Sequence, residues 1–244
     1  MLRKLLQPFY TAYVVIIFVA TLFTVLPFYI LLSIPHNKHF RKIMWLLSKY
    51  WARAWLWLTG MPVKVYGSMP GQRKYVVVAN HVSYLDAIVI FDMFPWYFRP
   101  LGKKELSKVP LFGFIYKQMA LMVDRSNPYS RAKSMRLMWR ALRHECNIFI
   151  YPEGTFNETA DPMKSFYDGA FRLAINAGVP ILPILFPDTK ARWHYSKWWK
   201  IWPGKNRAFI MEPIFTEGLG AEDVAALREK VKAIMSDRMK ELMP

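Results

Sequence analysis

The longest feature of the hydrophobic pattern is an apolar run near the first residue. No charged residue occurs between Lys4 and Lys38, and residues 9–34 are almost entirely apolar. As a helix this run would be about 39 Å long, against roughly 30 Å of bilayer hydrocarbon. It can span a membrane with tilt, or kink at Pro27 and lie partly within one leaflet. A secretory signal peptide is the alternative, but no small-residue cleavage pattern follows the run, and we expect a membrane anchor.

A second segment, residues 43–58, mixes aromatic and basic positions. It carries tryptophans and cations in alternation, namely Trp45, Lys49, Trp51, Arg53, Trp55 and Trp57. This pattern predicts an interfacial helix with indoles at headgroup depth and cations pointing outward, and a helix packed on the main domain is the alternative. Basic residues flank the first run on both sides, so the positive-inside rule leaves the topology open. We expect residues 1–60 to form membrane-anchoring helices.

From Pro62 onward, short apolar strands alternate with helical patterns. Strands are predicted at 75–79, 119–124, 148–151, 181–185 and 208–211. Helices are predicted at 85–94, about 129–145, 166–177 (closed by Gly178) and 222–242. This alternation predicts an α/β fold with a mixed, mostly parallel sheet flanked by helices, whose ligands bind at the strand ends. Residues 61–244 are therefore expected to form one α/β domain behind a membrane-embedded helical segment.

Composition narrows the expected partners. The chain has 244 residues, of which 54% are hydrophobic, and its 34 Lys+Arg against 17 Asp+Glu give a net charge of +17. A chain that is both apolar and basic favours an anionic membrane surface. Nucleic acid is the other usual basic partner, but it gives the apolar excess no role. The single cysteine, Cys146, excludes an intrachain disulfide and is expected to be a small buried residue rather than a nucleophile.

The first cluster with candidate chemistry is the segment 80–86 (NHVSYLD), directly after a predicted strand. A neutral imidazole at His81 is a good general base near pH 7, and Asp86 can accept from its other ring nitrogen. The pair works only if His81 precedes the helix and Asp86 lies in its first turn. The alternative is an ordinary capping box, with Ser83 as N-cap and Asp86 at N3, which needs no catalysis.

Two further clusters follow predicted strands. Arg125 stands after the strand 119–124, where a guanidinium can hold a phosphate with two parallel hydrogen bonds; the alternative is a surface ion pair with Asp124. After the strand 148–151, Gly154 allows close backbone approach and Thr155 adds a hydroxyl. There Glu153 can orient Arg125 or Lys104, or meet a substrate hydroxyl. The alternative is a simple turn.

In this order the clusters resemble the sequence boxes of the lysophosphatidic acid acyltransferase family of glycerolipid acyltransferases. Residues 80–86 resemble its H-x4-D box, and residues 104–125 its second box. Residues 151–155 (YPEGT) resemble its third box, F-P-E-G-T-R-S, and residues 179–183 (VPILP) resemble its fourth. The resemblance implies acyl transfer from acyl-CoA or acyl-carrier protein to the free hydroxyl of lysophosphatidic acid, which gives phosphatidic acid. It implies no metal and no cofactor besides the thioester co-substrate.

The resemblance also implies residue roles. His81 would be the general base and Asp86 would orient it. The acceptor phosphate and glycerol would be bound by Lys104, Arg125, Glu153, Gly154 and Thr155. Asn80 and Ser83 would support the site, and Pro183 lies in the segment expected to help hold the acyl donor.

The sequence departs from the family pattern where the third box usually has an arginine. Phe156 and Asn157 stand there, so Lys104, Arg125 or Lys164 would have to supply the cation. The second box also departs, with Met-Ala at 119–120 and Met-Val at 122–123. The alternatives are an acyltransferase for another lysolipid, a catalytically silent lipid-binding scaffold and a hydrolase. A hydrolase is disfavoured because the sequence contains no G-x-S-x-G nucleophile motif.

A basic aromatic segment, residues 190–205 (KARWHYSKWWKIWPGK), lies outside the boxes. It suits an anionic bilayer surface, and the alternatives are the phosphates of coenzyme A or single-stranded nucleic acid. The expected partners are a bilayer with anionic lipids, a lysophospholipid acceptor, an acyl thioester donor and acyl carrier protein, without nucleic acid. We expect a membrane location, with the catalytic domain on the cytoplasmic face.

Overall fold

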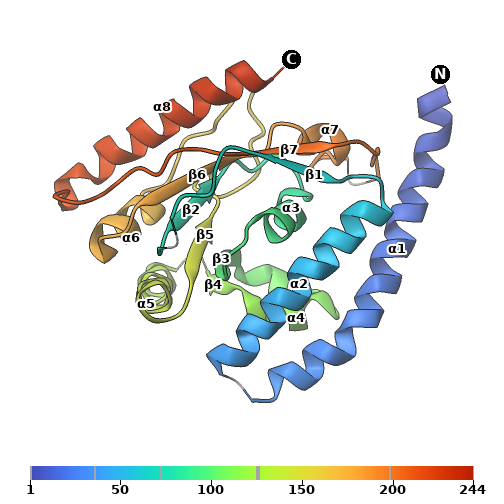
Figure 1. Ribbon diagram of the computed structural model, residues 1–244, viewed down its shortest axis with the longest axis horizontal. Helices are drawn as coiled ribbons and strands as arrows, with labels where there is room; N and C mark the ends of the chain where they lie inside the picture. The colour runs from blue at the N-terminus through green and yellow to red at the C-terminus, as the bar shows by residue number, and fades with distance from the viewer. Residues whose placement is uncertain (1, 36, 72, 125–126, 198, 244) are drawn as a thin grey trace. The chain divides into compact units, whose positions relative to one another are not determined.

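The computed structural model describes residues 2–35, 37–71, 73–124, 127–197 and 199–243. The chain forms two compact units whose segments alternate along the sequence. Unit 1 comprises residues 1–66, 81–95 and 186–209, and unit 2 comprises residues 67–80, 96–185 and 210–244. Figure 1 labels the helices and strands of both units.

Unit 1 is built on a pair of long helices, α1 (Leu2–Ser33) and α2 (Lys38–Leu58), which lie side by side as a hairpin (Figure 1). The predicted apolar run forms most of α1, and residues Arg3–Ser33 are long and apolar enough to cross a membrane. Asn37 begins α2, because its side chain accepts hydrogen bonds from the backbone N–H groups of His39 and Phe40.

The tryptophans of α2 do not share one environment. Trp45 and Trp55 are 2% and 0% exposed, whereas Trp57 is 76% exposed. Phe18 of α1 meets the ring of Trp55 edge-on, with 6.1 Å between centroids. Much of the aromatic surface of α2 is therefore core between helices.

The cations of α2 also bind within unit 1. Lys49 donates to the backbone carbonyl of Phe94 at 3.0 Å, and Arg53 donates to the Asp92 carboxylate at 2.8 Å. Burial and the neighbouring Arg53 lower the pKa of Lys49. Lys49 does not point outward as expected, because α3 (Asp86–Met93) packs against α2 and the carbonyl of Phe94 at its end accepts from the ammonium. The Arg53 side chain binds Asp92 but stays 60% exposed.

The rest of unit 1 consists of short elements. β1 (Val63–Tyr66) pairs in parallel with β7 (Asn206–Ile210), from Val63 opposite Asn206 to Tyr66 opposite Phe209. The one-turn helix α7 (Thr189–Arg192) begins the segment that carries the basic aromatic residues.

Unit 2 contains five parallel strands in the order β6-β2-β5-β3-β4. Their bounds are β2 (Val76–Ala79), β3 (Phe98–Lys103), β4 (Leu121–Val123), β5 (Asn147–Ile150) and β6 (Ile181–Leu185). Every residue of β2, β5 and β6 is buried, as expected for parallel strands covered on both faces. Antiparallel pairing within the described part of unit 2 is limited to a single bridge, Ile181 with Ile214.

Helices flank these strands. Their bounds are η1 (Lys104–Lys108), α4 (Phe112–Met119), α5 (Pro128–His144), α6 (Gly169–Ala177), η2 (Ala221–Asp223) and α8 (Val224–Leu242). α5 packs on β4 and β5, α6 on β2, and α8 on β6. Gly178 ends α6 with φ +62°, as predicted. The predicted α/β fold with a mostly parallel sheet and flanking helices is confirmed, and Cys146 is buried as expected.

The strand prediction was wrong in detail. Residue 119 ends α4 instead of beginning a strand, so β4 is shorter than the predicted 119–124. β1, β3 and α4 were not predicted at all.

Candidate active site

The first candidate cluster lies in unit 1, where the chain enters α3. Asp86 is the first residue of α3 and is 0% exposed. His81 precedes the helix, and its Nδ1 lies 3.0 Å from Asp86 Oδ2. His81 therefore precedes the helix and Asp86 lies in its first turn, as the general-base interpretation of the sequence needs. The imidazole keeps an exposed fraction of 18%, so the pair joins a buried carboxylate to an accessible ring.

The Asp86 carboxylate accepts from several donors besides His81. The backbone N–H groups of Val82 and Ser83 donate to Oδ2 at 2.7 and 2.8 Å. The Thr189 hydroxyl donates to Oδ1 at 2.5 Å, and Thr189 is itself 0% exposed. Since these donors come from two separate segments, the carboxylate is held in one orientation toward the imidazole.

The hydrogen bonds of the capping-box alternative are partly present, but α3 begins at Asp86 with Leu85 at the N-cap, so the predicted places of Ser83 at the N-cap and Asp86 at N3 are wrong. The bond from the Ser83 N–H to Asp86 is its backbone half, and the Ser83 hydroxyl accepts from the Leu85 N–H at 3.0 Å. The same carboxylate thus serves the helix start and faces the histidine. The cap explains why Asp86 is placed here, but it does not account for a histidine on the same oxygen.

The loop of His81 is tied to the basic aromatic segment. The Ser83 hydroxyl donates to the Trp193 carbonyl at 2.5 Å, and Ser83 forms an antiparallel bridge with His194. The rings of Tyr84 and Trp193 lie 5.5 Å apart. Residues 190–205 were expected to face a bilayer or coenzyme A; in the structure their first part also supports the histidine loop. Trp198 lies outside the described residues.

An ion pair holds the segment that carries Thr189. Arg207 on β7 donates to Asp188 through both its side chain, at 2.7 and 2.8 Å, and its backbone N–H, at 2.8 Å. Burial raises the pKa of Asp188, but the hydrogen bonds and charge of Arg207 outweigh it, so the pKa lies below its ordinary value. Asp188 and Arg207 therefore position the residue that orients Asp86.

An ionised Asp86 can only accept, so His81 carries its proton on Nδ1 when it is neutral. The basic lone pair then lies on Nε2. This tautomer is the one that a general base needs.

The third box lies in unit 2, in the turn after β5. Gly154 adopts φ +76°, a left-handed conformation that explains why glycine stands there. Glu153 is 0% exposed, and its Oε2 accepts the backbone N–H of Lys164 at 2.9 Å. The Lys164 ammonium donates to the Thr155 hydroxyl at 2.8 Å. Of the cations considered as substitutes for the missing arginine, Lys164 is therefore placed directly on this turn.

The remaining predicted residues are also in unit 2. Lys104 begins η1, and its ammonium lies 3.6 Å from the carboxylate of Asp124, the residue considered as the partner of Arg125. Arg125 itself lies outside the described residues. Asn80 is 0% exposed at the end of β2. Pro183 lies within β6, opposite Val78.

The structure thus forms two clusters. Unit 1 brings together His81, Ser83 and Asp86, and unit 2 brings together Glu153, Gly154 and Thr155. Sequence reasoning missed Thr189, because a hydroxyl that lies 103 residues from its acceptor leaves no local pattern.

Comparison with known proteins identifies the family. A family model described as Acyltransferase matches residues 62–186. The 1-acyl-sn-glycerol-3-phosphate acyltransferase alpha of Ovis aries is 30% identical over 210 residues, which are 84% of this chain and 70% of the relative. This chain belongs to the lysophosphatidic acid acyltransferase family. The 1-acyl-sn-glycerol-3-phosphate acyltransferase of Pseudomonas aeruginosa is 29% identical over 230 residues, 90% of this chain and 85% of the relative. The chain is therefore an acyltransferase, as its sequence boxes predicted.

A solved structure supports the fold of this family member. The 1-acyl-sn-glycerophosphate (LPA) acyltransferase PlsC of Thermotoga maritima matches with a TM-score of 0.76 at 24% identity, over 98% of this chain and 97% of the other. At this identity the likeness concerns the fold alone.

Proposed function

We propose that this acyltransferase moves a fatty acyl group from a thioester to the free hydroxyl of lysophosphatidic acid, which gives phosphatidic acid. The observation that carries the proposal is the contact of His81 with the buried Asp86, in a chain of this family. The names of the relatives, which specify 1-acyl-sn-glycerol-3-phosphate, support this acceptor.

His81 acts as the general base. Its Nε2 takes the proton of the acceptor hydroxyl while the hydroxyl oxygen attacks the thioester carbonyl carbon. Asp86 stabilises the imidazolium that forms. The carbon–sulfur bond then breaks, the imidazolium returns the proton to the departing sulfur, and the products are an ester and a free thiol.

The acceptor phosphate and glycerol bind to residues of the third and second boxes. Glu153, Gly154 and Thr155 form one part of this site, and Lys104 and Arg125 supply positive charge. Lys164 contributes the cation that Phe156 and Asn157 do not provide. Its hydrogen bond to Thr155 supports this role. Asn80, Ser83 and Pro183 hold the surrounding backbone.

The membrane supplies the acceptor. Residues 1–60 serve as membrane-anchoring helices and residues 61–244 as the catalytic domain, which faces the cytoplasm, where soluble thioesters are available. The length and hydropathy of α1 support the anchor. The basic aromatic segment 190–205 rests on anionic lipid headgroups. Acyl-CoA and acyl carrier protein are the donor classes compatible with this reaction.

The deciding experiment measures thiol release from hexadecanoyl-CoA and from hexadecanoyl carrier protein by detergent-purified protein, with and without lysophosphatidic acid. We expect release that requires the acceptor and is lost in His81→Ala. Release without an acceptor would indicate a thioesterase. If folded protein releases no thiol from any pair, the silent lipid-binding scaffold takes the place of this proposal.

Another lysolipid acceptor is the second candidate. It is favoured by Asn157, which stands near the position of the missing arginine and is 3% exposed. Its amide donates to the Asp161 carbonyl at 2.9 Å, so this position shapes the loop and does not offer a charge to a phosphate. Parallel assays with lysophosphatidylethanolamine and lysophosphatidylglycerol distinguish the acceptors, since a preference for either over lysophosphatidic acid would favour the second candidate.

A further inference from the structure

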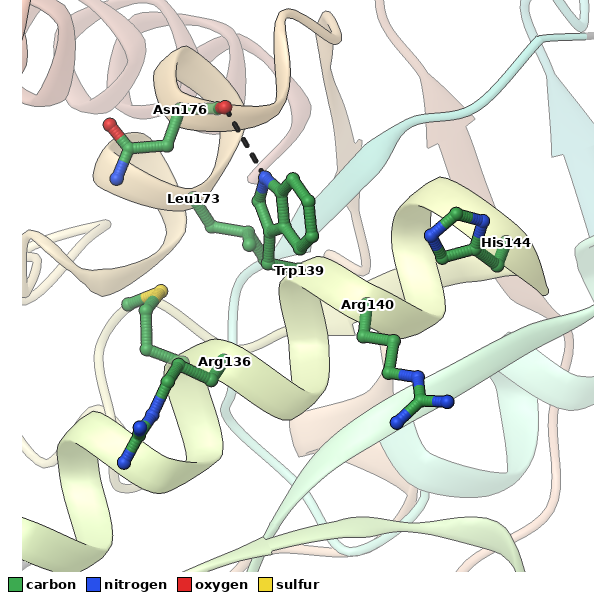
Figure 2. Close-up of a pocket in the computed structure, with 7 residues that line it drawn as sticks. Arg136, Trp139, Arg140, His144, Leu173 and Asn176 are labelled. Atoms are coloured by element: carbon green, nitrogen blue, oxygen red, sulfur yellow. Dashed lines mark hydrogen bonds between the residues drawn. The ribbon is translucent and has the colours of Figure 1, made fainter.

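A groove of unit 2 lies apart from the residues assigned above. It has a volume of about 540 Å³ and lies between α5 and α6 (Figure 2). Its lining residues are Met135, Arg136, Trp139, Arg140, His144, Leu173 and Asn176. Figure 2 shows Trp139 reaching toward α6, while Arg136 and Arg140 extend from the other side of α5. The groove therefore combines an apolar surface with a cationic border.

The charge of this surface has one sign. α5 carries exposed basic side chains and no acidic residue; the basic residues are Arg131, Lys133, Arg136, Arg140 and Arg143. α6 contains no acidic residue either. A ligand that covers this groove must therefore be acidic to be complementary.

The residue types favour a protein over a lipid surface. Arginine, methionine and tryptophan are enriched in protein–protein interfaces, and lysine is depleted. The groove has Met135, Arg136, Trp139 and Arg140 and is lined by no lysine among the described residues. The segment 190–205 of unit 1 is instead rich in lysine, and an anionic bilayer surface attracts lysine as well as arginine.

Trp139 is already held in place. Its indole N–H donates to the Asn176 carbonyl at 3.4 Å, and the Arg143 guanidinium lies 5.7 Å from its ring centroid. The side chain nevertheless remains 40% exposed. A large aromatic group that is ordered before binding loses little conformational entropy in a complex, which is typical of an interface anchor.

The shape suits a helix. Residues 135–144 of α5 extend over about 14 Å, or two and a half turns. An amphipathic helix can lay its apolar face on Met135 and Trp139, and place acidic side chains against Arg136 and Arg140.

One end of the groove is close to the third box. A Cβ on Gly169 at the start of α6 would lie 3.9 Å from the Met135 methyl group. The Tyr167 N–H donates to the Pro152 carbonyl at 2.9 Å, next to Glu153. A partner in the groove is thus placed near the turn of the proposed acceptor site within the same unit.

We propose that the α5–α6 groove docks an acidic helix of the carrier protein that delivers the acyl thioester. Of the two donor classes compatible with the reaction, only acyl carrier protein presents a protein surface. The inference rests on the proposed acyl transfer and adds the donor class and the surface that recognises it.

The test compares Arg136→Glu/Arg140→Glu with the matched charge reversal Lys230→Glu/Lys232→Glu on α8, outside the groove. Both are assayed with hexadecanoyl carrier protein and with hexadecanoyl-CoA, at saturating lysophosphatidic acid. The groove variant is expected to raise the KM for the carrier-protein thioester about tenfold or more, because charge reversal turns attraction into repulsion. Its KM for hexadecanoyl-CoA and its kcat should match the control. If the charge reversal lowers the Tm, Arg136→Gln/Arg140→Gln replaces it, with a smaller expected increase of the KM for the carrier-protein thioester.

Other outcomes overturn the proposal. Equal kinetics of the groove and control variants would show that the groove docks nothing in this reaction. A higher KM for hexadecanoyl-CoA alone would indicate a coenzyme A phosphate site, and loss with both donors would indicate a general effect. Reduced flotation with phosphatidylglycerol vesicles, at unchanged carrier kinetics, would indicate a membrane surface.

A binding measurement separates this inference from the proposed function. Calorimetry of carrier protein with the His81→Ala protein requires no turnover. Binding that is lost on Arg136→Glu/Arg140→Glu supports the docking surface even if lysophosphatidic acid proves to be the wrong acceptor. Absence of binding in a protein that turns over hexadecanoyl-CoA overturns the docking surface and leaves the acyl transfer intact.

Discussion

The hydroxyl of Thr189 offers a sharp test of how the His81–Asp86 pair is held. Thr189→Val keeps the shape of the side chain and removes its hydrogen bond to Asp86 Oδ1, where both residues are 0% exposed. A hydrogen bond to a charged group contributes about 1.5–3 kcal/mol, and the carboxylate oxygen is left without this donor in the buried site. We therefore expect a stability loss of about 2 kcal/mol. For a chain of this size that lowers the Tm by roughly 4–8 °C.

The same change should slow the reaction. With one donor removed, Asp86 can rotate away from His81 Nδ1, so the imidazolium is less well stabilised. We expect kcat to fall about tenfold or more while the KM for either substrate stays near that of the wild type, as for partners that orient a reacting group. Thr189→Ser keeps the hydroxyl and should restore most of kcat. A Thr189→Val protein with unchanged kcat and Tm would refute this account of how Asp86 is oriented.

Four further predictions concern the proposed site and its support. His81→Ala should lower kcat at least about 100-fold in steady-state assays, with an unchanged circular dichroism spectrum, because general-base catalysis supplies about 10²–10⁴. Lys164→Ala should raise the KM for lysophosphatidic acid about tenfold with little change of kcat, and Lys164→Arg should not; a fall of kcat alone would contradict the phosphate role. Arg125→Ala should likewise raise mainly the acceptor KM. Asp188→Asn should lower the unfolding free energy in urea at pH 7. The hydrogen bonds and charge of Arg207 lower the pKa of Asp188 below its ordinary value of 3.8. The ion pair therefore stabilises the fold above that pH and loses this effect below it, so the unfolding free energies of wild type and variant should converge in acid.

Much of the fold could be predicted because buried parallel strands have an unmistakable composition. β2, β5 and β6 are short runs of almost wholly apolar residues, and both faces of each strand are covered. β3 was missed because its sequence, FRPLGK, contains a proline, a glycine and two cations, and its strand state depends on pairing with β4 and β5. Strand pairing of this kind depends on residues far apart in the sequence, so it produces no hydrophobic periodicity within the strand itself.

The candidate site shows the same division. The spacing of His81 and Asp86 could be interpreted locally, since five residues fit a strand-to-helix turn. Thr189 and Trp193 could not be found in this way, because their partners lie in segments more than a hundred residues distant. The partner of Arg53 was missed for a similar reason: the sequence shows a cation among tryptophans, but Asp92 comes from a separate helix.

Asp86 shows why a structural and a catalytic interpretation of one residue need not compete. Its Oδ2 accepts the backbone N–H groups of Val82 and Ser83, in the turn just before α3, so this turn fixes where the carboxylate lies. His81 meets the same oxygen, so the turn that holds the carboxylate also holds the imidazole. A substitution such as Asp86→Ala would remove the cap and the orienting group together, and its loss of activity could not be assigned to either. Thr189 contacts only the other oxygen, Oδ1, so its substitution leaves the helix cap in place and isolates the orienting role.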